Sequence, residues 1–296
     1  MSEVRHRLYR AGIWAVTAPL PRKHRVALRH RLRGRLDNRL VLKADWVVLS
    51  RAKSGRTWVR VLLSRLFQQQ FDLPENELLE YDNFHRMNPA IPIIAMTHGH
   101  YLDELADNRI HGEALRNKPV VFLIRDPRDV AVSEYFQSTK RASAYKRELY
   151  GVGEHDSMFD FVMNSSAGLP GIITYLNHWH RVLADWPRVY RLKYELLRAR
   201  PEAELAALCE FLGQPFSTEA VAEAVRFASF DKLKAREKEN YFRNNRLSAK
   251  NPEDPDSFKV RRGKVGGYRD YFSDDEIEAM DRFVAENLVP AIGYAD

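Results

Sequence analysis

The chain has 296 residues, of which 45% are hydrophobic and 29% charged, a composition typical of an ordinary globular protein. A chain of this length buries enough surface to fold without disulfides or structural metal ions. Its single cysteine, Cys209, excludes an intramolecular disulfide and a thiolate zinc cluster, and it favours a reducing compartment such as the cytoplasm. No stretch approaches the roughly 18 consecutive apolar residues that a transmembrane helix needs.

Positive charge is concentrated at the start of the chain. The formal net charge is +7, yet residues 1–43 alone hold twelve Lys or Arg against two acids. This asymmetry predicts a basic N-terminal arm over residues 1–43, ahead of one domain over residues 44–296. Leucines recur every four residues from 28 to 40, so the arm is either a helix packed on the domain or a peripheral contact to an anionic membrane. Nucleic acid is the less favoured anionic partner.

From residue 45 onward, short apolar runs alternate with helical patterns. Strands are expected at residues 45–50, 91–96, 119–124 and 188–192. Helices are expected at residues 57–67, 201–212, 218–228 and 274–287, and Asp126-Pro127 reads as the start of another. This order predicts an α/β fold with a central parallel sheet flanked by helices. Residues 140–170 and 240–262 lack periodicity and are expected to form loops around a binding site.

The first strand is followed by a loop and helix start that read RAKSGRTW. A strand, a glycine-containing loop and a helix N-terminus form an anion cradle, because backbone N–H groups converge there. Gly55 and Thr57 fit the P-loop pattern G-x-x-x-x-G-K-[ST]. However, Ser50 and Arg56 replace its first glycine and its lysine, and the lysine lies at Lys53 instead. That position suits an anion near the loop's entrance, while a basic turn without a ligand is the alternative.

Two further basic segments favour an anion-binding loop over a basic turn without a ligand. RDPRDVAVS, from Arg125 to Ser133, follows the third strand, and FKVRRGKVGGYR occupies residues 258–269. Ligands of open α/β sheets bind outside the carboxyl ends of the strands, so the first segment is expected to converge with the phosphate loop. The glycines and basic side chains of the second segment could wrap a second phosphate.

Together these segments closely resemble the sulfotransferases that use 3′-phosphoadenosine 5′-phosphosulfate (PAPS), in particular the cytosolic type-1 branch and its bacterial relatives. KSGRTW resembles their 5′-phosphosulfate loop, usually K-S-G-T-T-W, and IRDPRDVAVSEYF resembles their 3′-phosphate segment. RRGKVGGYR resembles the late R-K-G-x-x-G-x-x-K segment, LKYELL the Y-E-D-L turn, and SFDKLK the S-F-x-x-L-K run. The five segments stand in family order within residues 45–290. The resemblance implies a single domain with the P-loop-kinase-like sulfotransferase fold.

The resemblance also implies a role for each matching position. The 5′-phosphosulfate end would be held by Lys53, Ser54, Gly55, Arg56, Thr57 and Trp58. The 3′-phosphate would be bound by Arg125, Ser133, Arg261, Arg262 and Gly263. The adenine would be flanked by Tyr194 and Phe230 and also touched by Trp58. Three positions depart from the pattern, where Arg56, Leu196 and Arg269 replace the usual Thr, Asp and Lys. Arg56 leaves the role of that side chain open, while its backbone N–H can still serve.

The expected chemistry is in-line transfer of a sulfuryl group to an acceptor hydroxyl or amine, in which the protein positions the reactants and stabilises charge. Lys53 would neutralise the leaving phosphate, and this logic requires no metal. An acceptor hydroxyl also needs a base, and histidine suits that task near neutral pH. His98, in the MTHGH segment after the second strand, matches the family's K-T-H histidine. His100 and Glu80 are the alternatives.

Two other classes of function compete with this interpretation. A P-loop kinase or NTPase would explain Gly55 and Thr57 but not the other four segments. A non-catalytic nucleotide-binding protein could share the fold, although the presence of both Lys53 and His98 argues against it. The acceptor itself stays open between a small molecule, a glycan and a lipid.

Overall fold

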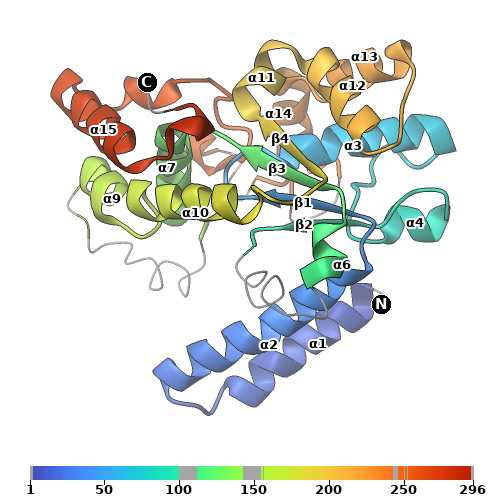
Figure 1. Cartoon of the computed structure of the whole chain (residues 1–296), viewed down its shortest axis with the longest axis horizontal. Coiled ribbons are helices and arrows are strands. Elements are labelled where there is room, and N and C mark those ends of the chain that lie inside the picture. The colour runs from blue at the N-terminus through green and yellow to red at the C-terminus, as the bar shows by residue number, and fades with distance from the viewer. Residues whose placement is uncertain are drawn as a thin grey trace.

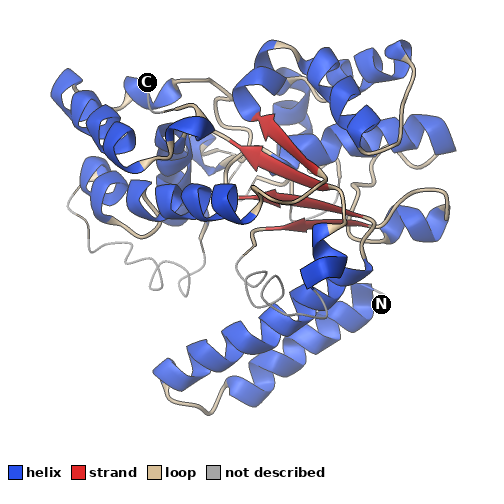
Figure 2. Cartoon of the chain, in the orientation of Figure 1, coloured by secondary structure: helices blue, strands red, loops and turns tan. Residues whose placement is uncertain are grey.

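A computed structural model describes residues 3–99, 112–142, 155, 157–242, 246–249, 251 and 253–294 of the chain. Its centre is a sheet of four parallel strands in the order β2-β1-β3-β4 (Figure 2). The strands are β1 (Trp46–Ser50), β2 (Ile94–Thr97), β3 (Val120–Ile124) and β4 (Val189–Lys193). The predicted parallel sheet is therefore confirmed, with β2 beginning later than expected because Pro92 has no N–H for the ladder.

Each face of the sheet has its own hydrophobic core, because successive strand residues point to opposite sides. Val47, Leu49 and Phe122 face one core, while Trp46, Val48 and Val121 face the other. The first core is covered by α7 (Pro127–Phe136), α9 (Met158–Asn164), α10 (Leu169–Val182) and α15 (Asp274–Asn287). The second is covered by α3 (Arg56–Phe71), α12 (Pro201–Phe211), α13 (Thr218–Phe227) and α14 (Phe230–Lys238), on the opposite side (Figure 1).

Local signals in the sequence fix several helix ends. The side chain of Asp126 caps α7 by accepting from the backbone N–H of Arg128 at 2.9 Å. Ser273 and Glu276 form a capping box at the start of α15. The helix predicted over residues 57–67 extends to Phe71. This extension is supported by Gln68, whose buried amide donates to the carbonyl of Glu77 at 2.7 Å.

The stretches expected to be loops contain elements of their own. Residues 140–170 include the end of a π-helical turn, η1 (Gln137–Arg141), all of α9 and the start of α10. Short helices α4 (Asn83–Met87), α6 (Gly112–Arg116) and α11 (Tyr194–Ala199) complete the described set, with 3-10 turns η2 (Pro255–Ser257), η3 (Gly267–Asp270) and η4 (Pro290–Ile292). Of these, η1 and η3 lie beside the strand ends and bear on the site.

The basic arm forms two helices, α1 (Glu3–Thr17) and α2 (Arg22–Lys43), which lie side by side and project from the sheet domain (Figure 1). They are joined through Arg29, whose Nε donates to Thr17 Oγ1 at 2.7 Å and whose guanidinium lies 3.7 Å from the Trp14 ring centroid. The carboxyl end of α2 contacts the domain, where the Tyr81 hydroxyl donates to the Leu40 carbonyl at 2.8 Å. Not every arginine of the arm therefore faces solvent, since Arg29 is buried.

Candidate active site

All four parallel strands deliver their carboxyl ends to one edge of the sheet. The strands end at Ser50, Thr97, Ile124 and Lys193, and Leu49 is in register with both Thr97 and Phe122. The residues that follow are the phosphate loop, His98, Arg125 and Tyr194. In the sheet, β2 and β3 lie on opposite sides of β1. The carboxyl end of β1 is therefore the topological switch point, where ligands of such sheets bind.

The phosphate loop has an unusual backbone that brings it against Tyr194. Lys53 and Gly55 both have positive φ, at 68° and 102°. A Cβ on Gly55 would come within 2.6 Å of Cδ2 of Tyr194, so only glycine fits there. No side chain caps the first turn of α3 within the described structure. Its N–H groups therefore face the loop and can receive an anion.

Lys53 lies at the centre of this edge. Its Nζ donates to Oε1 of Gln137 at 3.3 Å, which ties the loop to the π-helical turn after α7. Burial lowers the pKa of Lys53 from its usual value to about 8, an effect that Glu134 opposes and Arg125 reinforces. Because burial disfavours the charged form of Lys53, an anion bound next to it would stabilise the ammonium.

Arg125 links the loop to the late basic segment. Its Nη1 donates to the Lys53 carbonyl, and its Nη2 donates to the Lys264 carbonyl and to Asp129, each at 3.3 Å. The guanidinium lies 4.3 Å from the Tyr194 ring centroid. Its Nε is buried and has no hydrogen-bond partner among the described residues. A cation with an unused donor at this edge fits a phosphate ligand.

Two buried acids hold the late basic segment against the site. Asp129 accepts from the backbone N–H groups of Gly266 and Tyr268, each at 3.0 Å. Glu237, which has no exposed surface, accepts from the backbone N–H groups of Lys259 at 2.7 Å and Val260 at 2.8 Å. The segment is thus fixed at both ends, on either side of Arg261, Arg262 and Gly263.

The side chains expected at the 3′-phosphate lie within and beside this segment. Arg261 stacks 3.9 Å from the Phe136 ring centroid and also donates to the Tyr271 hydroxyl. Arg262 donates to the same hydroxyl at 3.1 Å and pairs with Asp270 at 2.7 Å. Ser133 lies one turn after Asp129 on α7 and is half-buried. An anion would have to draw Arg262 from Asp270, a pair that is partly exposed and weak.

The aromatic side chains expected at the adenine form two groups. Trp58 packs edge-on against Tyr194 with ring centroids 5.8 Å apart, and its Nε1 donates to the Ala228 carbonyl at 2.9 Å. Phe230 begins α14 and packs against Gly263, where a Cβ would come within 2.7 Å of the ring. Trp58 and Tyr194 are therefore packed against each other, and Phe230 is packed against Gly263.

His98 is fixed in one tautomer by its neighbours. Its Nδ1 lies 2.9 Å from the Ser50 carbonyl, and its Nε2 lies 2.6 Å from Nη2 of Arg56. A carbonyl only accepts and a guanidinium only donates, so Nδ1 carries the proton and Nε2 offers a lone pair. This neutral tautomer is the form that a general base requires. The side chain of Arg56 thus points to His98, and only the backbone of Arg56 contributes to the phosphate loop.

Of the alternative bases, Glu80 is less well placed than His98. Glu80 is engaged by Nε of Arg246 at 2.5 Å and by Nη1 of Arg60 at 3.6 Å, so its oxygens are already paired. His100 lies outside the described residues. Cys209 is buried in the second core, and burial raises its thiol pKa to about 12, which agrees with a packing role.

Several residues of the site have no role that the sequence motifs assign. Gln137 comes from the π-helical turn, as does Arg141, which pairs with Glu237 of α14 at 3.5 Å. Lys259 lies within the late basic segment, just ahead of the two arginines, at a position to which the resemblance gives no role. Burial and nearby cations lower the pKa of Lys259 to about 7. Only Asp129 carried a usable signal, since it follows Arg125 at helical spacing in RDPRD.

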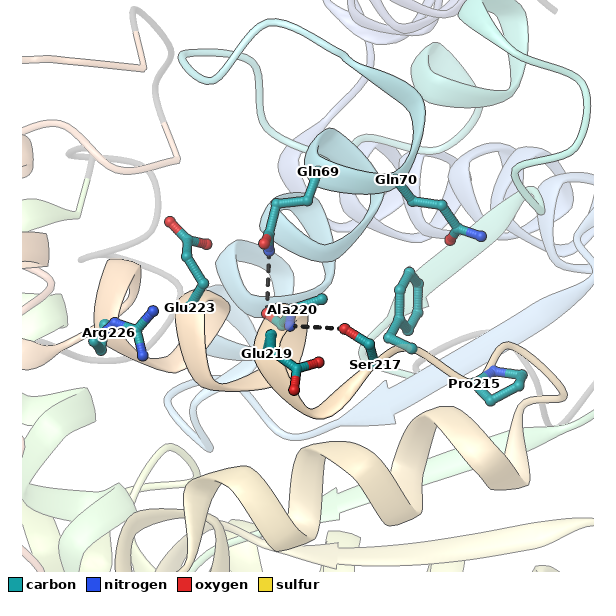
Figure 3. A pocket seen from close by; sticks show the side chains of 9 residues that line it. Gln69, Gln70, Pro215, Ser217, Glu219, Ala220, Glu223 and Arg226 are labelled. Carbon is teal, nitrogen blue, oxygen red and sulfur yellow. Dashed lines mark hydrogen bonds between the residues drawn. The ribbon is translucent and has the colours of Figure 1, made fainter.

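The edge described above is distinct from a wide hollow at the far end of α3. That hollow has a volume of about 620 Å³ and lies between Gln69 and Gln70 of α3 and the start of α13 (Figure 3). The amide of Gln69 donates to the Ala220 carbonyl at 3.1 Å across it. Gln69 lies roughly 20 Å along α3 from Gly55, given the ~1.5 Å rise per helical residue, so the hollow does not belong to the active site.

Two observations concern metals and membranes. Within the described ranges, no group of three or more His, Cys, Asp or Glu side chains is arranged to hold a metal ion. None of the helices described is both long and apolar enough to cross a bilayer.

Several known proteins have sequences similar to that of this chain. The chain is 25% identical to flavonol 3-sulfotransferase of Flaveria bidentis over 293 residues, which covers 87% of this chain and 86% of that protein. It is 27% identical to cytosolic sulfotransferase 7 of Arabidopsis thaliana, over 82% of this chain and 78% of that protein. It is 25% identical to human sulfotransferase 6B1, with coverage of 82% and 76%.

A solved structure has a similar fold. A crystal structure of retinol dehydratase in a complex with retinol and PAP superposes with a TM-score of 0.50 at 18% identity, covering 83% of this chain and 81% of that one. The family described as "Sulfotransferase domain" matches residues 43–289, which include every strand and every site residue named above. The kinase and NTPase alternative is thereby set aside, and the chain belongs to the sulfotransferase family.

Proposed function

We propose that this sulfotransferase takes its sulfuryl group from PAPS and passes it to a hydroxyl or amine of a small-molecule acceptor. One observation carries the proposal: Lys53, His98, Arg125 and Tyr194 follow four different strands and meet at one edge of the sheet. The orphaned Nε of Arg125 and the glycine contacts at Gly55 and Gly263 make this edge suitable for a nucleotide with two anionic ends.

The residues divide between the two ends of the nucleotide. The backbone N–H groups of residues 54–58 and the Lys53 ammonium would hold the 5′-phosphosulfate. The 3′-phosphate would lie among Arg125, Ser133, Arg261, Arg262 and the Gly263 backbone. Trp58, Tyr194 and Phe230 would bound the adenine. PAPS supplies the sulfuryl group and the phosphate leaving group of the transfer.

The residues of the chain would then position the reactants and stabilise the charge that develops during the transfer. Lys53 would stabilise the charge that develops on the leaving phosphate, an effect strengthened because its ammonium is desolvated. His98, as the Nδ1–H tautomer, would accept the acceptor's proton at Nε2. The Ser50 carbonyl would accept from Nδ1–H both in that tautomer and in the imidazolium that forms when Nε2 takes the proton.

Transfer of labelled sulfur from PAPS to a panel of phenols, alcohols and amines tests this function. The proposal predicts a labelled product with at least one acceptor class, and loss of that product when Lys53 is replaced by Ala. Tight nucleotide binding without transfer to any acceptor would favour the non-catalytic alternative. The relatives named for flavonols and for the cytosol make phenols the first acceptors to try and the cytoplasm the expected location.

We also propose that residues 1–43 form a separate arm that contacts anionic membrane surfaces, ahead of a catalytic domain over residues 44–296. Tyr9, Trp14 and Val16 of α1 are 43%, 44% and 69% exposed, beside an excess of basic residues. Exposed aromatics and cations are the features of interfacial helices. Co-sedimentation with phosphatidylserine vesicles should occur at low salt and weaken at high salt, while phosphatidylcholine vesicles serve as the control. No binding to the anionic vesicles at low salt would leave the arm as a packed helical hairpin.

A further inference from the structure

Among the described residues in the cluster that joins His98 Nε2 to Glu80, arginines outnumber acids. Arg56 contacts His98 directly, and the charges of Arg56 and Arg246 both act on Arg60. Glu80 is the acid described in this cluster, and its two oxygens are divided between Arg60 and Arg246. No ion pair joins Arg56 to an acid in the ranges that the structure describes.

Arg56 has a donor to spare. Its Nη1 is buried and has no hydrogen-bond partner among the described residues. Burial lowers the pKa of its guanidinium to about 10, which leaves it protonated at neutral pH. A buried cation with an unmet N–H is costly, and an anionic oxygen would remove that cost.

The contact with His98 fixes where such an anion would lie. A hydroxyl that loses its proton to His98 must come within about 2.6–3.2 Å of Nε2. Arg56 Nη2 now lies 2.6 Å from that atom, so the bound hydroxyl would take its place beside the guanidinium. A carboxylate, phosphate or sulfate on the same acceptor would then pair with Arg56 through two parallel hydrogen bonds. A neutral acceptor would offer Arg56 only its hydroxyl oxygen and would leave the buried Nη1 without an anionic partner.

We propose that Arg56 is a specificity-determining residue that selects acceptors carrying an anionic group close to the sulfated hydroxyl. This inference rests on the proposed function, because it assumes that His98 faces the acceptor. The sulfonate end of PAPS is the other source of anionic oxygens near Arg56, and the experiment separates the two.

The test uses 2-, 3- and 4-hydroxybenzoate and their methyl esters, which differ in charge but keep the hydroxyl. Binding is measured calorimetrically with the enzyme saturated with 3′-phosphoadenosine 5′-phosphate (PAP), and transfer is measured with PAPS. At least one acid should bind about tenfold or more tightly than its ester, as a charge-assisted hydrogen bond predicts. Arg56→Thr, which introduces the residue usual in the family, should abolish that preference, and Arg56→Lys should keep part of it. PAP affinity should change less than threefold in both variants.

Arg282→Thr is the matched control, because it removes one positive charge from an exposed pair with Glu278 on α15. It should leave the preference for acids intact. Equal binding of acids and esters by the wild-type enzyme would overturn the inference, as would a preference that persists in Arg56→Thr. A large loss of PAPS affinity in Arg56→Thr with the acid preference unchanged would assign Arg56 to the donor and overturn it too. Failure of PAP to bind the wild-type enzyme would instead refute the proposed function itself.

Discussion

The carboxylate of Asp129 accepts a hydrogen bond of 3.0 Å from the backbone N–H of Gly266, which lies 137 residues further along the chain. The same carboxylate accepts from Tyr268 and pairs with Arg125. One buried side chain thus holds the late basic segment, a helix of the first core and an arginine proposed to bind phosphate in a single arrangement. The proposed 3′-phosphate site depends on this residue although a nucleotide would not touch it.

Asp129→Ala should therefore reduce both stability and nucleotide affinity. The change leaves the backbone N–H groups of Gly266 and Tyr268 without their acceptor and removes one of the three acceptors of Arg125. Each lost bond to a charged group costs roughly 1.5–3 kcal/mol, so the two backbone bonds alone should lower the free energy of unfolding by at least about 3 kcal/mol. PAP binding should weaken at least about tenfold. Urea denaturation and calorimetry measure the two effects. Asp185→Ala, at an exposed position, is the control and should change neither. Unchanged PAP affinity in Asp129→Ala would show that the segment is held by other contacts.

Gly55→Ala should impair nucleotide binding far more than the same substitution at another glycine with positive φ. Both Gly55 and Gly213 have positive φ, at 102° and 73°. A Cβ at Gly55 meets the Tyr194 ring at 2.6 Å, whereas nothing lies within 4 Å of one at Gly213. Gly213→Ala should cost only about 1 kcal/mol of stability from its left-handed backbone. Gly55→Ala should in addition lose PAP binding, measured by calorimetry. Equal affinity of the two variants for PAP would contradict the close packing of loop and Tyr194.

Lys53 should set an alkaline limit on activity. Burial lowers its pKa to about 8 in the free enzyme, and kcat/KM reports the free enzyme. As the pH rises through about 8, Lys53 loses its proton and its charge, so kcat/KM for PAPS should fall. Lys53→Arg should move that fall to higher pH, because a guanidinium stays protonated. Lys259→Met is the control, since the pKa of Lys259 is lowered to about 7, and the fall should survive in it. A fall near pH 8 that persists in Lys53→Arg would assign it to another group.

His98→Ala should separate chemistry from binding. Loss of a general base typically costs a factor of roughly 10²–10⁴ in rate, so kcat should drop within that range. PAP should still stabilise the variant against heat, because the nucleotide contacts come from other loops. His100→Ala, two residues further on, is the matched variant and should keep most of its turnover. An active His98→Ala together with an inactive His100→Ala would show that the base is His100.

The parts of the structure that follow local rules could be predicted from the sequence. Apolar runs of β-branched residues give the strands, and Asp126-Pro127 and Ser273 give the helix starts, because capping depends on neighbours a few residues away. The motif residues Lys53, His98 and Arg125 could be placed at strand ends because each follows a predicted strand by one to three residues. Contacts between distant segments could not be derived in this way. Glu237 reaches Lys259 from a position of α14 that lies beyond the SFDKLK motif, and the direction of the Arg56 side chain depends on the packing around His98.

The central claim is that the edge formed by β1–β4 recognises an adenine nucleotide with a 3′-phosphate. Calorimetric titration with PAP, with AMP and with ATP plus Mg²⁺ tests it without knowledge of the acceptor. The account predicts that PAP binds at least about 100-fold more tightly than AMP, because Arg125, Arg261 and Arg262 contribute charge-assisted bonds to the 3′-phosphate alone. It also predicts that Arg125→Ala removes most of this difference. Equal affinity for PAP and AMP, or tighter binding of ATP with Mg²⁺, would contradict it.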